Sequence, residues 1–394
     1  MIFPRFVAVW SCVCVIGSGA GVSLDAQKST PATGRQTVGK ARQQASVDRE
    51  IAARFAPIFY QALGDKPRSD YLTNFDFDGD WRGDNNWSNS DDKKHPLKAY
   101  VYYSVSETAS HLFIHYAVFH PKDYKGGERK GSILSELIRE GTKRGGKYDP
   151  TGLAEEAALA HENDMEGCLI IAAKDGKDLE RSRVIFVQTL HHNNFSRYVY
   201  GDLSPKVFER IRTLDQHPLL YIEPKGHGIE SFTGTEKQVL RKDFLLYRFS
   251  GQADDPGGRN GNSLVCRDPA NASCPISVAY DLLPIRTTLW AKAKDAPNAT
   301  YAETCDYGRV SITVQESNGR TAEKKINVGR VGCAFLGRVG GRDMARPPWA
   351  WFDKDERDRL LGQWFFDPAV TVKRDFQLDD RFSTAYLRLP FWAN

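Results

Sequence analysis

Residues 161–166, with the sequence HENDME, combine side chains of the types that bind a divalent cation. They lead into the apolar segment 168–173, whose length and polar flanks predict a buried strand. Side chains two residues apart in a strand point the same way, so we expect Asp164 and Glu166 to share one face, with His161 reaching them from the preceding turn. One imidazole and two carboxylates that converge are typical of a divalent-cation site. The alternative is a polar loop before a core strand.

A second acidic segment, residues 76–86, has carboxylates at alternating positions around an internal glycine, which is the composition of a calcium loop. It is not an EF-hand, because Gly79 comes at the fourth place and Trp87 stands where a bidentate glutamate is needed. The alternative is a loop whose Asn and Asp side chains hydrogen-bond their own backbone. The candidate calcium ligands are Asp76, Asp78, Asp80 and Asp84.

Histidines follow two later predicted strands. Gly226 and Gly228 flank His227 and predict a tight turn that presents the imidazole, the alternative being a solvated histidine in a surface turn. His191 and His192 follow the strand 185–190, and one of two adjacent strand-end histidines must point away from the other. If the protein is an enzyme, His227 or His192 is the expected acid or base.

Other catalytic patterns are absent from the sequence. It has no G-x-S-x-G nucleophile elbow, no G-x-x-x-x-G-K-[ST] phosphate loop and no dinucleotide-binding fingerprint between a strand and a helix. A zinc-peptidase motif fails because His161-Glu162 is not followed by a second histidine at the required place. The chain has 394 residues and a formal charge of +4, with Lys and Arg scattered among Asp and Glu, so nothing favours a nucleic-acid partner.

The N-terminus is typical of a targeting segment. Arg5 precedes the apolar stretch 6–16, and small residues follow at 17–20, so we interpret residues 1–26 as a signal peptide. An uncleaved anchor is the alternative. The signal predicts a secreted or extracytoplasmic protein. Residues 27–47 have little apolar content and predict a disordered linker.

Five cysteines lie beyond the signal, and an exported chain meets oxidising conditions. Cys266 and Cys274 flank a short polar loop and form a plausible local bridge, while Cys305 and Cys333 are placed to close a hairpin. Cys168 is then left unpaired in its apolar strand. Connectivity does not follow from sequence, so both pairings are hypotheses.

The pattern beyond the linker is mainly β. A helix is expected to begin near Asp48, and β-branched and aromatic runs predict a β-sandwich core within residues 48–250. Residues 128–160 read as a helical insertion in this core. We expect residues 251–394 to form a C-terminal β/irregular, aromatic-rich extension that packs on the same body. The predicted strands are 100–105, 111–119, 168–173, 183–189, 197–201, 219–223, 308–315 and 324–331.

The strand 111–119 continues into Pro121-Lys122-Asp123. This feature, followed by H-x-x-D-x-E before an apolar strand, resembles the necrosis- and ethylene-inducing-peptide-like cytolysins and the related vacuolar-protein-sorting-like family. The resemblance covers about residues 95–235. It implies a β-sandwich that holds a divalent cation, directly or through water, with ligands corresponding to Asp123, His161, Asp164 and Glu166.

This chain departs from the cytolysin motif at three places. The family glycine is Ala160, the second histidine is Asn163 and the tryptophan is Met165. The insertion 128–160 also has no counterpart in the compact cytolysins. The departures leave all four implied ligands in place.

Three functions fit these observations. The first is a secreted, cytolysin-like protein whose Ca²⁺ or Mg²⁺ ion binds an anionic or hydroxylated head group of a membrane lipid or glycan. The second is a metal-dependent hydrolase of phosphoester or glycan bonds. The third is an envelope protein with a structural cation. A binding cation and a catalytic cation use the same ligands, so the sequence does not separate the first two, and it does not predict the oligomeric state.

Overall fold

The structure is a computed structural model that describes residues 32–124, 160–176, 178–201, 208–257, 277–338, 345–355 and 361–391, with side chains from Arg42 onward. Residues from Ala45 onward form one compact unit, and the chain up to Gln44 belongs to a separate one. The description below concerns the larger unit, called the body.

Strands dominate the described residues, which confirms the mainly β class. The strands are β1 (Ile58–Ala62), β2 (Tyr100–Thr108), β3 (His111–Asp123), β4 (His161–Asp175), β5 (Asp178–His191), β6 (Asn194–Val199), β7 (Glu209–Arg210), β8 (Thr213–Leu214), β9 (His217–Ile222), β10 (Ile229–Ser231), β11 (Phe244–Phe249), β12 (Val278–Pro284), β13 (Tyr301–Asp306), β14 (Arg309–Gln315), β15 (Thr321–Asn327), β16 (Arg330–Phe335) and β17 (Tyr386–Arg388). The helices are α1 (Ala32–Arg54), η1 (Pro67–Asp70), α2 (Asn86–Asn89), α5 (Lys237–Arg241), η3 (Ile285–Thr287), α6 (Leu289–Ala293), η4 (Pro348–Ala350), α7 (Gln363–Phe366) and α8 (Pro368–Asp375).

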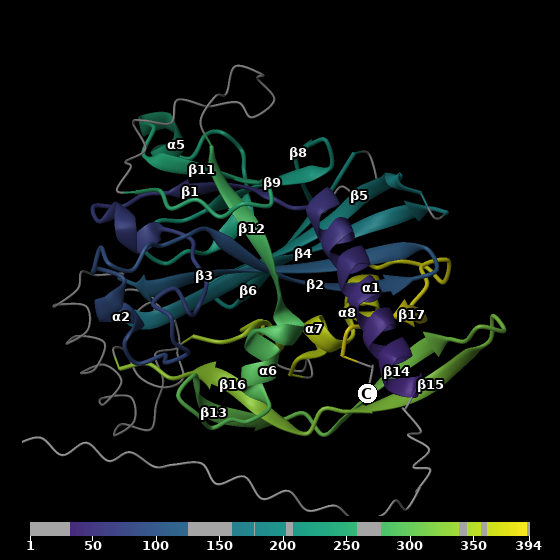
Figure 1. The fold of residues 1–394 in the computed structure, drawn as a ribbon. Coiled ribbons are helices and arrows are strands. Elements are labelled where there is room, and N and C mark those ends of the chain that lie inside the picture. Colours follow the sequence, from purple (N-terminus) through teal and green to yellow (C-terminus); the bar gives the residue numbers. More distant parts are fainter. Residues whose placement is uncertain are drawn as a thin grey trace, which may run out of the picture. The chain divides into compact units, whose positions relative to one another are not determined.

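One large, curled, mixed sheet organises the body (Figure 1). Its main path runs β10-β9-β1-β11-β12-β2-β3-β4-β5-β6-β7, and β2 to β6 form an antiparallel series at its centre. A separate two-stranded sheet pairs β13 with β16. These layers are consistent with the predicted β-sandwich-like core.

Both faces of β3 are buried, because different segments cover them. On one face, the Tyr116 hydroxyl donates to the carbonyl of Ala52 in α1, at 2.6 Å. On the other face, His115 lies beside the rings of Trp364 and Phe365, with centroids 4.7 and 5.0 Å away. A strand that is covered on both faces needs apolar side chains on both, so its sequence is apolar along most of its length. This explains the continuous hydrophobic runs of β3 and β4.

The aromatic C-terminal region fills the space between the main sheet and the small sheet. The Trp349 indole N–H donates to the carbonyl of Gly332 in β16, and that of Trp351 to the carbonyl of Met165 in β4. Gly167 in β4 makes room for this packing, since a Cβ there would lie 2.3 Å from the Trp351 ring. Trp351 thereby packs against β4, the strand that carries the predicted metal ligands.

The structure shows the pairing of three of the five cysteines beyond the predicted signal. Cys305 and Cys333 form a disulfide between β13 and β16, which confirms the predicted bridge. Cys168 is a free, buried cysteine in β4, as expected. Cys266 and Cys274 lie outside the described residues, as do the predicted signal peptide 1–26 and residues 128–159 of the predicted helical insertion.

Two predicted elements differ from the structure. Helix α1 begins at Ala32 instead of near Asp48, so residues 32–47 of the predicted linker are helical. The Ala, Gln, Lys and Arg residues of this stretch favour a helix even without an apolar face. The predicted strand 324–331 is the end of β15 and the start of β16, separated at Gly329, whose φ of 65° suits a turn.

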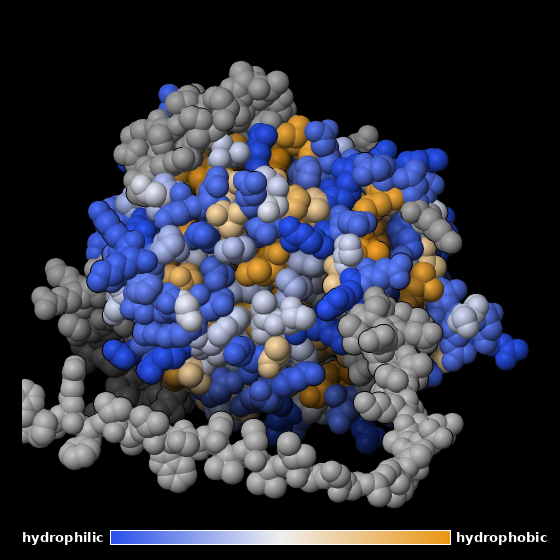
Figure 2. Space-filling view, in the orientation of Figure 1, coloured by the Kyte–Doolittle hydropathy of each residue, from blue (hydrophilic) through white to orange (hydrophobic). Residues whose placement is uncertain are grey.

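The surface shown in Figure 2 is mostly polar and charged, with apolar residues in separate groups. Among the described residues, no helix has both the length and the apolar character needed to cross a membrane.

Candidate metal centre

The predicted ligands lie on the neighbouring antiparallel strands β3 and β4. Asp123 pairs directly with His161, and His120 pairs with Asp164. Asp123, His161, Asp164 and Glu166 are all 5–7% exposed, which places them at the boundary between the core and the solvent. His161 is the first residue of β4, not part of a preceding turn.

Asn163 interrupts the regular geometry of β4. In an uninterrupted strand, His161 and Asp164 would point to opposite faces. Asn163 between them has a left-handed φ of 60°, which asparagine tolerates better than most residues. When protonated, His161 carries a charge that lowers the Asp164 pKa, so its ring lies near that carboxylate. We attribute this proximity to the interruption at Asn163.

The His161 ring has a defined tautomer. Its Nδ1 lies 2.8 Å from the carbonyl oxygen of Asn163, and a carbonyl only accepts, so Nδ1 carries the hydrogen. In the neutral ring, Nε2 then has a lone pair, and it lies 3.7 Å from Asp123 Oδ2. This is the arrangement of a histidine ready to bind a metal ion through Nε2.

Asp164 is held by a buried histidine. His227 Nδ1 lies 2.8 Å from Asp164 Oδ2, and its Nε2 lies 3.2 Å from Asp70 Oδ1. The Gly-His-Gly turn does present this imidazole to the predicted site, with His227 at a φ of 54°. His227 is fully buried, so it is not the solvated turn histidine of the alternative interpretation.

The electrostatics of this group favour a charged His227. Burial lowers the His227 pKa, but hydrogen bonds to Asp164 and Asp70 and their charges outweigh it and raise the pKa to about 9. Burial likewise raises the Asp164 pKa, and the hydrogen bond and charge of His227 reverse this, leaving it below its usual value. The His120 ring stacks on His227 at 3.6 Å, and burial together with the neighbouring charge holds its pKa well below the usual value. His120 is therefore the neutral ring of the pair.

The motif residues between the predicted ligands anchor distant loops. Glu162 accepts the backbone N–H groups of Trp87 and Arg338, at 2.7 and 2.6 Å. Asn163 donates to the carbonyls of Gly83 and Leu336, at 2.8 and 2.9 Å. Its own side-chain oxygen accepts from Asn86 at 2.7 Å. The sequence alone predicts no role for Glu162 or Asn163, because their partners lie 75 to 176 residues away.

The structure does not gather all four predicted ligands into one tight group. In the described part of the chain, His120, Asp164 and His227 have ligand atoms that all lie within 4.8 Å of one another. Asp123 and His161 form a separate pair. Glu166 pairs with Val118, two residues further along β4 from Asp164. The four-ligand centre remains a prediction.

The acidic segment 76–86 adopts the hydrogen-bonded form of a polar loop. Asp76 accepts from Asn74, and Asp78 accepts from Asn89. Asp80 accepts from Asn85 and from the backbone of Arg82, whose guanidinium binds Asp84. Among the described residues, two groups of side chains could hold a metal ion, and neither group contains any of these four aspartates. The calcium loop stays an untested prediction.

His191 and His192 both point to Glu223. His191 Nε2 lies 3.0 Å from Glu223 Oε1, and His192 Nε2 lies 2.7 Å from Glu223 Oε2. This is the second group of three whose ligand atoms lie within 4.8 Å. Strand alternation predicted that one of the two histidines would point away. His192 has a left-handed φ of 47°, which breaks the strand alternation and explains the difference.

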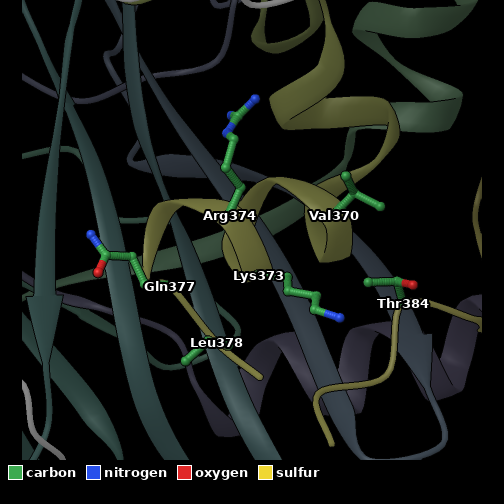
Figure 3. A pocket seen from close by; sticks show the side chains of 6 residues that line it. All are labelled: Val370, Lys373, Arg374, Gln377, Leu378 and Thr384. Atoms are coloured by element: carbon green, nitrogen blue, oxygen red, sulfur yellow. The ribbon is translucent and has the colours of Figure 1, made fainter. Parts of the chain in front are cut away.

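A surface pocket of about 600 Å³ lies elsewhere, along α8. Lys373 and Arg374 extend from α8, and Gln377 from the turn after it, in different directions (Figure 3). Lys373 pairs with Asp380, and Arg374 with Asp375. The pocket therefore has no converging set of polar groups and contains none of the predicted ligands.

Comparison with known proteins gave matches only at the level of structure. No protein-family model matches the sequence, and no curated protein matches it. Among solved structures, one match is necrosis and ethylene inducing protein 2 from the causal agent of cocoa's witches' broom disease, with 14% identity and a TM-score of 0.21 over 36% of this chain and 47% of that one. The non-toxic protein HaNLP3 matches with 14% identity and a TM-score of 0.22, over 48% of this chain and 53% of that one.

A third match is NLPPya in complex with glucosamine, with 12% identity and a TM-score of 0.24, over 47% of this chain and 67% of that one. The chain thus spans about half the length of the first two structures. At TM-scores of 0.21–0.24 and identities of 12–14%, these matches do not assign this chain to a family. The resemblance to the vacuolar-protein-sorting-like family rests on the sequence motif.

Proposed function

We propose that this protein is secreted and binds a divalent cation, Ca²⁺ or Mg²⁺, through Asp123, His161, Asp164 and Glu166. The cation in turn binds an anionic or hydroxylated head group of a lipid or glycan. Protein carboxylates would supply part of the coordination, and oxygens of water or of the head group would complete it.

The tautomer of His161 carries this proposal. Asn163 fixes the hydrogen on Nδ1, which leaves Nε2 facing the Asp123 carboxylate at 3.7 Å. That distance is too long for a good hydrogen bond. It is close to the spacing of about 3.3–3.7 Å between two ligands at right angles around an ion with bonds of 2.3–2.6 Å.

Asp164 supports the proposal through its second oxygen. His227 takes Oδ2, and within the described residues no hydrogen bond to Oδ1 is found. The imidazolium of His227 lies between Asp164 and Asp70, so one positive charge faces two carboxylates. The excess negative charge, increased by Asp123 and Glu166, favours binding of a cation.

Calorimetric titration of the full-length protein with CaCl₂ and MgCl₂ tests the cation. We expect Asp123→Asn and Asp164→Asn each to weaken binding at least tenfold, because each removes a charged ligand. Asp78→Asn is the matched control, since it changes a carboxylate of the second acidic segment. Unchanged affinity in both site variants would overturn the proposed centre, and loss in Asp78→Asn alone would assign the ion to the calcium loop.

The head group is tested separately, on protein with and without the cation. Glucosamine serves as the sugar probe, and vesicles containing phosphatidylglycerol serve as the anionic lipid probe. We expect one of the two to bind only when the cation is present and not to bind Asp123→Asn. If the probe binds equally well without the cation and in Asp123→Asn, head-group binding does not depend on the metal centre.

Of the two histidines predicted as acid or base of a hydrolase, His227 and His192, the first gives that interpretation no support. His227 is fully buried, and both of its nitrogens face carboxylates. An acid or base must reach the proton it transfers. In this conformation both nitrogens of His227 face carboxylates, and the ring positions Asp164.

A further inference from the structure

The cluster of His191, His192 and Glu223 lies outside the proposed cation centre. His191 ends β5 and His192 begins the turn to β6, while Glu223 follows β9. All three side chains are partly exposed, at 23%, 19% and 31%. Two imidazole nitrogens face the two oxygens of one carboxylate, with the rings 4.5 Å apart. The cluster therefore lies at the edge of the body, with His191 Nε2 itself buried, and offers two nitrogen ligands and one carboxylate.

We propose that His191, His192 and Glu223 form a second metal site, which binds Zn²⁺. Two histidines and one carboxylate are a common protein ligand set for zinc, with a fourth position left for water or another ligand. Mg²⁺ and Ca²⁺ prefer oxygen ligands, so this nitrogen-rich cluster selects a different ion from the carboxylate-rich centre.

The spacing fits a zinc ion after small movements. A tetrahedral ion with bonds of about 2.0–2.2 Å needs ligand atoms about 3.3 Å apart. The two nitrogen-to-oxygen distances are 3.0 and 2.7 Å. Shifts of a few tenths of an ångström would bring both nitrogen-to-oxygen distances to this value, and the ligand atoms of all three residues already lie within 4.8 Å of one another.

Glu230 gives His191 the support that metal-binding histidines usually have. Glu230 Oε1 lies 3.5 Å from His191 Nδ1, on the opposite side of the ring from Glu223. A carboxylate at one imidazole nitrogen favours a hydrogen there and leaves the lone pair on the other nitrogen for the metal. Here that other nitrogen is Nε2, the atom that faces Glu223.

The backbone is shaped to hold the cluster. His192 and Asn193 both have left-handed φ angles, 47° and 62°, which bring the two adjacent histidines to the same carboxylate. Gly228 lies against the His191 ring, and a Cβ there would be 2.1 Å from Cδ2. A glycine at this position is required for the observed ring placement.

Calorimetric titration of the full-length protein with ZnCl₂ tests the site. We expect one Zn²⁺ per chain at this cluster, and at least tenfold weaker binding in Glu223→Gln and in His192→Gln. The control is His95→Gln, which removes a partly exposed histidine whose ring contacts Phe77. Its zinc affinity should equal that of the wild type. X-ray data collected at the zinc absorption edge would locate the ion.

Glu223 pairs with both imidazoles, so its variants are first checked for folding by thermal unfolding. Glu230→Gln is the milder variant, because the side chain is 46% exposed and only supports His191, and we expect about tenfold weaker binding. Absence of zinc binding, or equal affinity in the wild type and these variants, would overturn the proposal. Zinc affinity that falls in Asp123→Asn but not in Glu223→Gln or His192→Gln would place the ion in the first centre and also overturn it.

Discussion

His227 Nδ1 lies 2.8 Å from Asp164 Oδ2 in the interior of the body, and Asp70 occupies the other imidazole nitrogen. Asp70 is also held by the backbone N–H groups of Gly64 and Lys225 and by the Tyr124 hydroxyl. A carboxylate with this many donors is a fixed part of the structure. The chain Asp70–His227–Asp164 therefore sets the position of one predicted ligand from within the core.

Replacement of His227 should destabilise the fold strongly. His227→Ala leaves two buried carboxylates without their shared cation, and breaking such a group costs about 3–5 kcal/mol. Urea unfolding in the presence of a chelator measures this cost without a contribution from bound metal. His95→Ala, which removes a partly exposed ring, should change stability by less than about 0.5 kcal/mol. Similar small effects in both variants would show that His227 does not hold the carboxylates.

Asn163 should be sensitive to substitution for two separable reasons. Asn163→Ala loses the donors to Gly83 and Leu336 and places a Cβ residue at positive φ. We expect a loss of about 2–4 kcal/mol. Asn163→Gly loses the same hydrogen bonds but tolerates the backbone angle, so it should be about 1 kcal/mol more stable than Asn163→Ala. Equal stabilities would argue against a backbone requirement at this position.

Acid should weaken the fold partly through His115. This ring is fully buried, donates from Nε2 to the Trp364 carbonyl, and has its pKa lowered by burial to about 4. The unfolded chain takes up the proton near pH 6.5, whereas the folded chain does not until about pH 4. The contribution of His115 to the free energy of unfolding is therefore complete above pH 6.5. It falls by about 3 kcal/mol in total as the pH drops toward 4.

The His115→Gln variant isolates this effect, because it keeps a donor for Trp364 and removes the titration. Urea unfolding at pH 7.5 and 4.5 should show a smaller loss of stability in the variant than in the wild type. A loss of the same size in both proteins would assign the acid sensitivity to other groups.

The disulfide between Cys305 and Cys333 should stabilise the C-terminal part of the body. It links positions 28 residues apart, and closing a loop of that length is worth about 3–4 kcal/mol. The double variant Cys305→Ala and Cys333→Ala should unfold at a correspondingly lower urea concentration. Cys168→Ala is the control, and it should keep the wild-type sensitivity to a reducing agent. A double variant as stable as the wild type would contradict the prediction.

The sequence identified the parts of the site that depend on local pattern. The apolar run after Glu166 predicted a strand, and β4 contains it within a longer element. Cys305 and Cys333 were paired correctly, because their spacing is compatible with two neighbouring strands. Glycines beside His227 predicted a turn aimed at the site, and the hydrogen bond to Asp164 shows that turn in place.

The parts that escaped prediction depend on contacts between distant residues. Asp70 lies 157 residues from His227, and nothing in its neighbours distinguishes it from an ordinary surface aspartate. The left-handed conformation of Asn163 follows from partners at Gly83 and Leu336. Strand prediction from an apolar run leaves out polar strand residues, so it placed His161 before β4. The alternation rule assumes extended backbone, so it separated His191 from His192.

The anchoring of Glu162 and Asn163 also bears on protein engineering. Transferring the six residues 161–166 into another β-protein would carry the ligand types without the backbone angle that orients His161. The smallest portable unit is β3 and β4 together with the loops around residues 83–87 and 336–338. Library designs that vary residues 161–166 should therefore keep positions 162 and 163 fixed and explore the ligand positions alone.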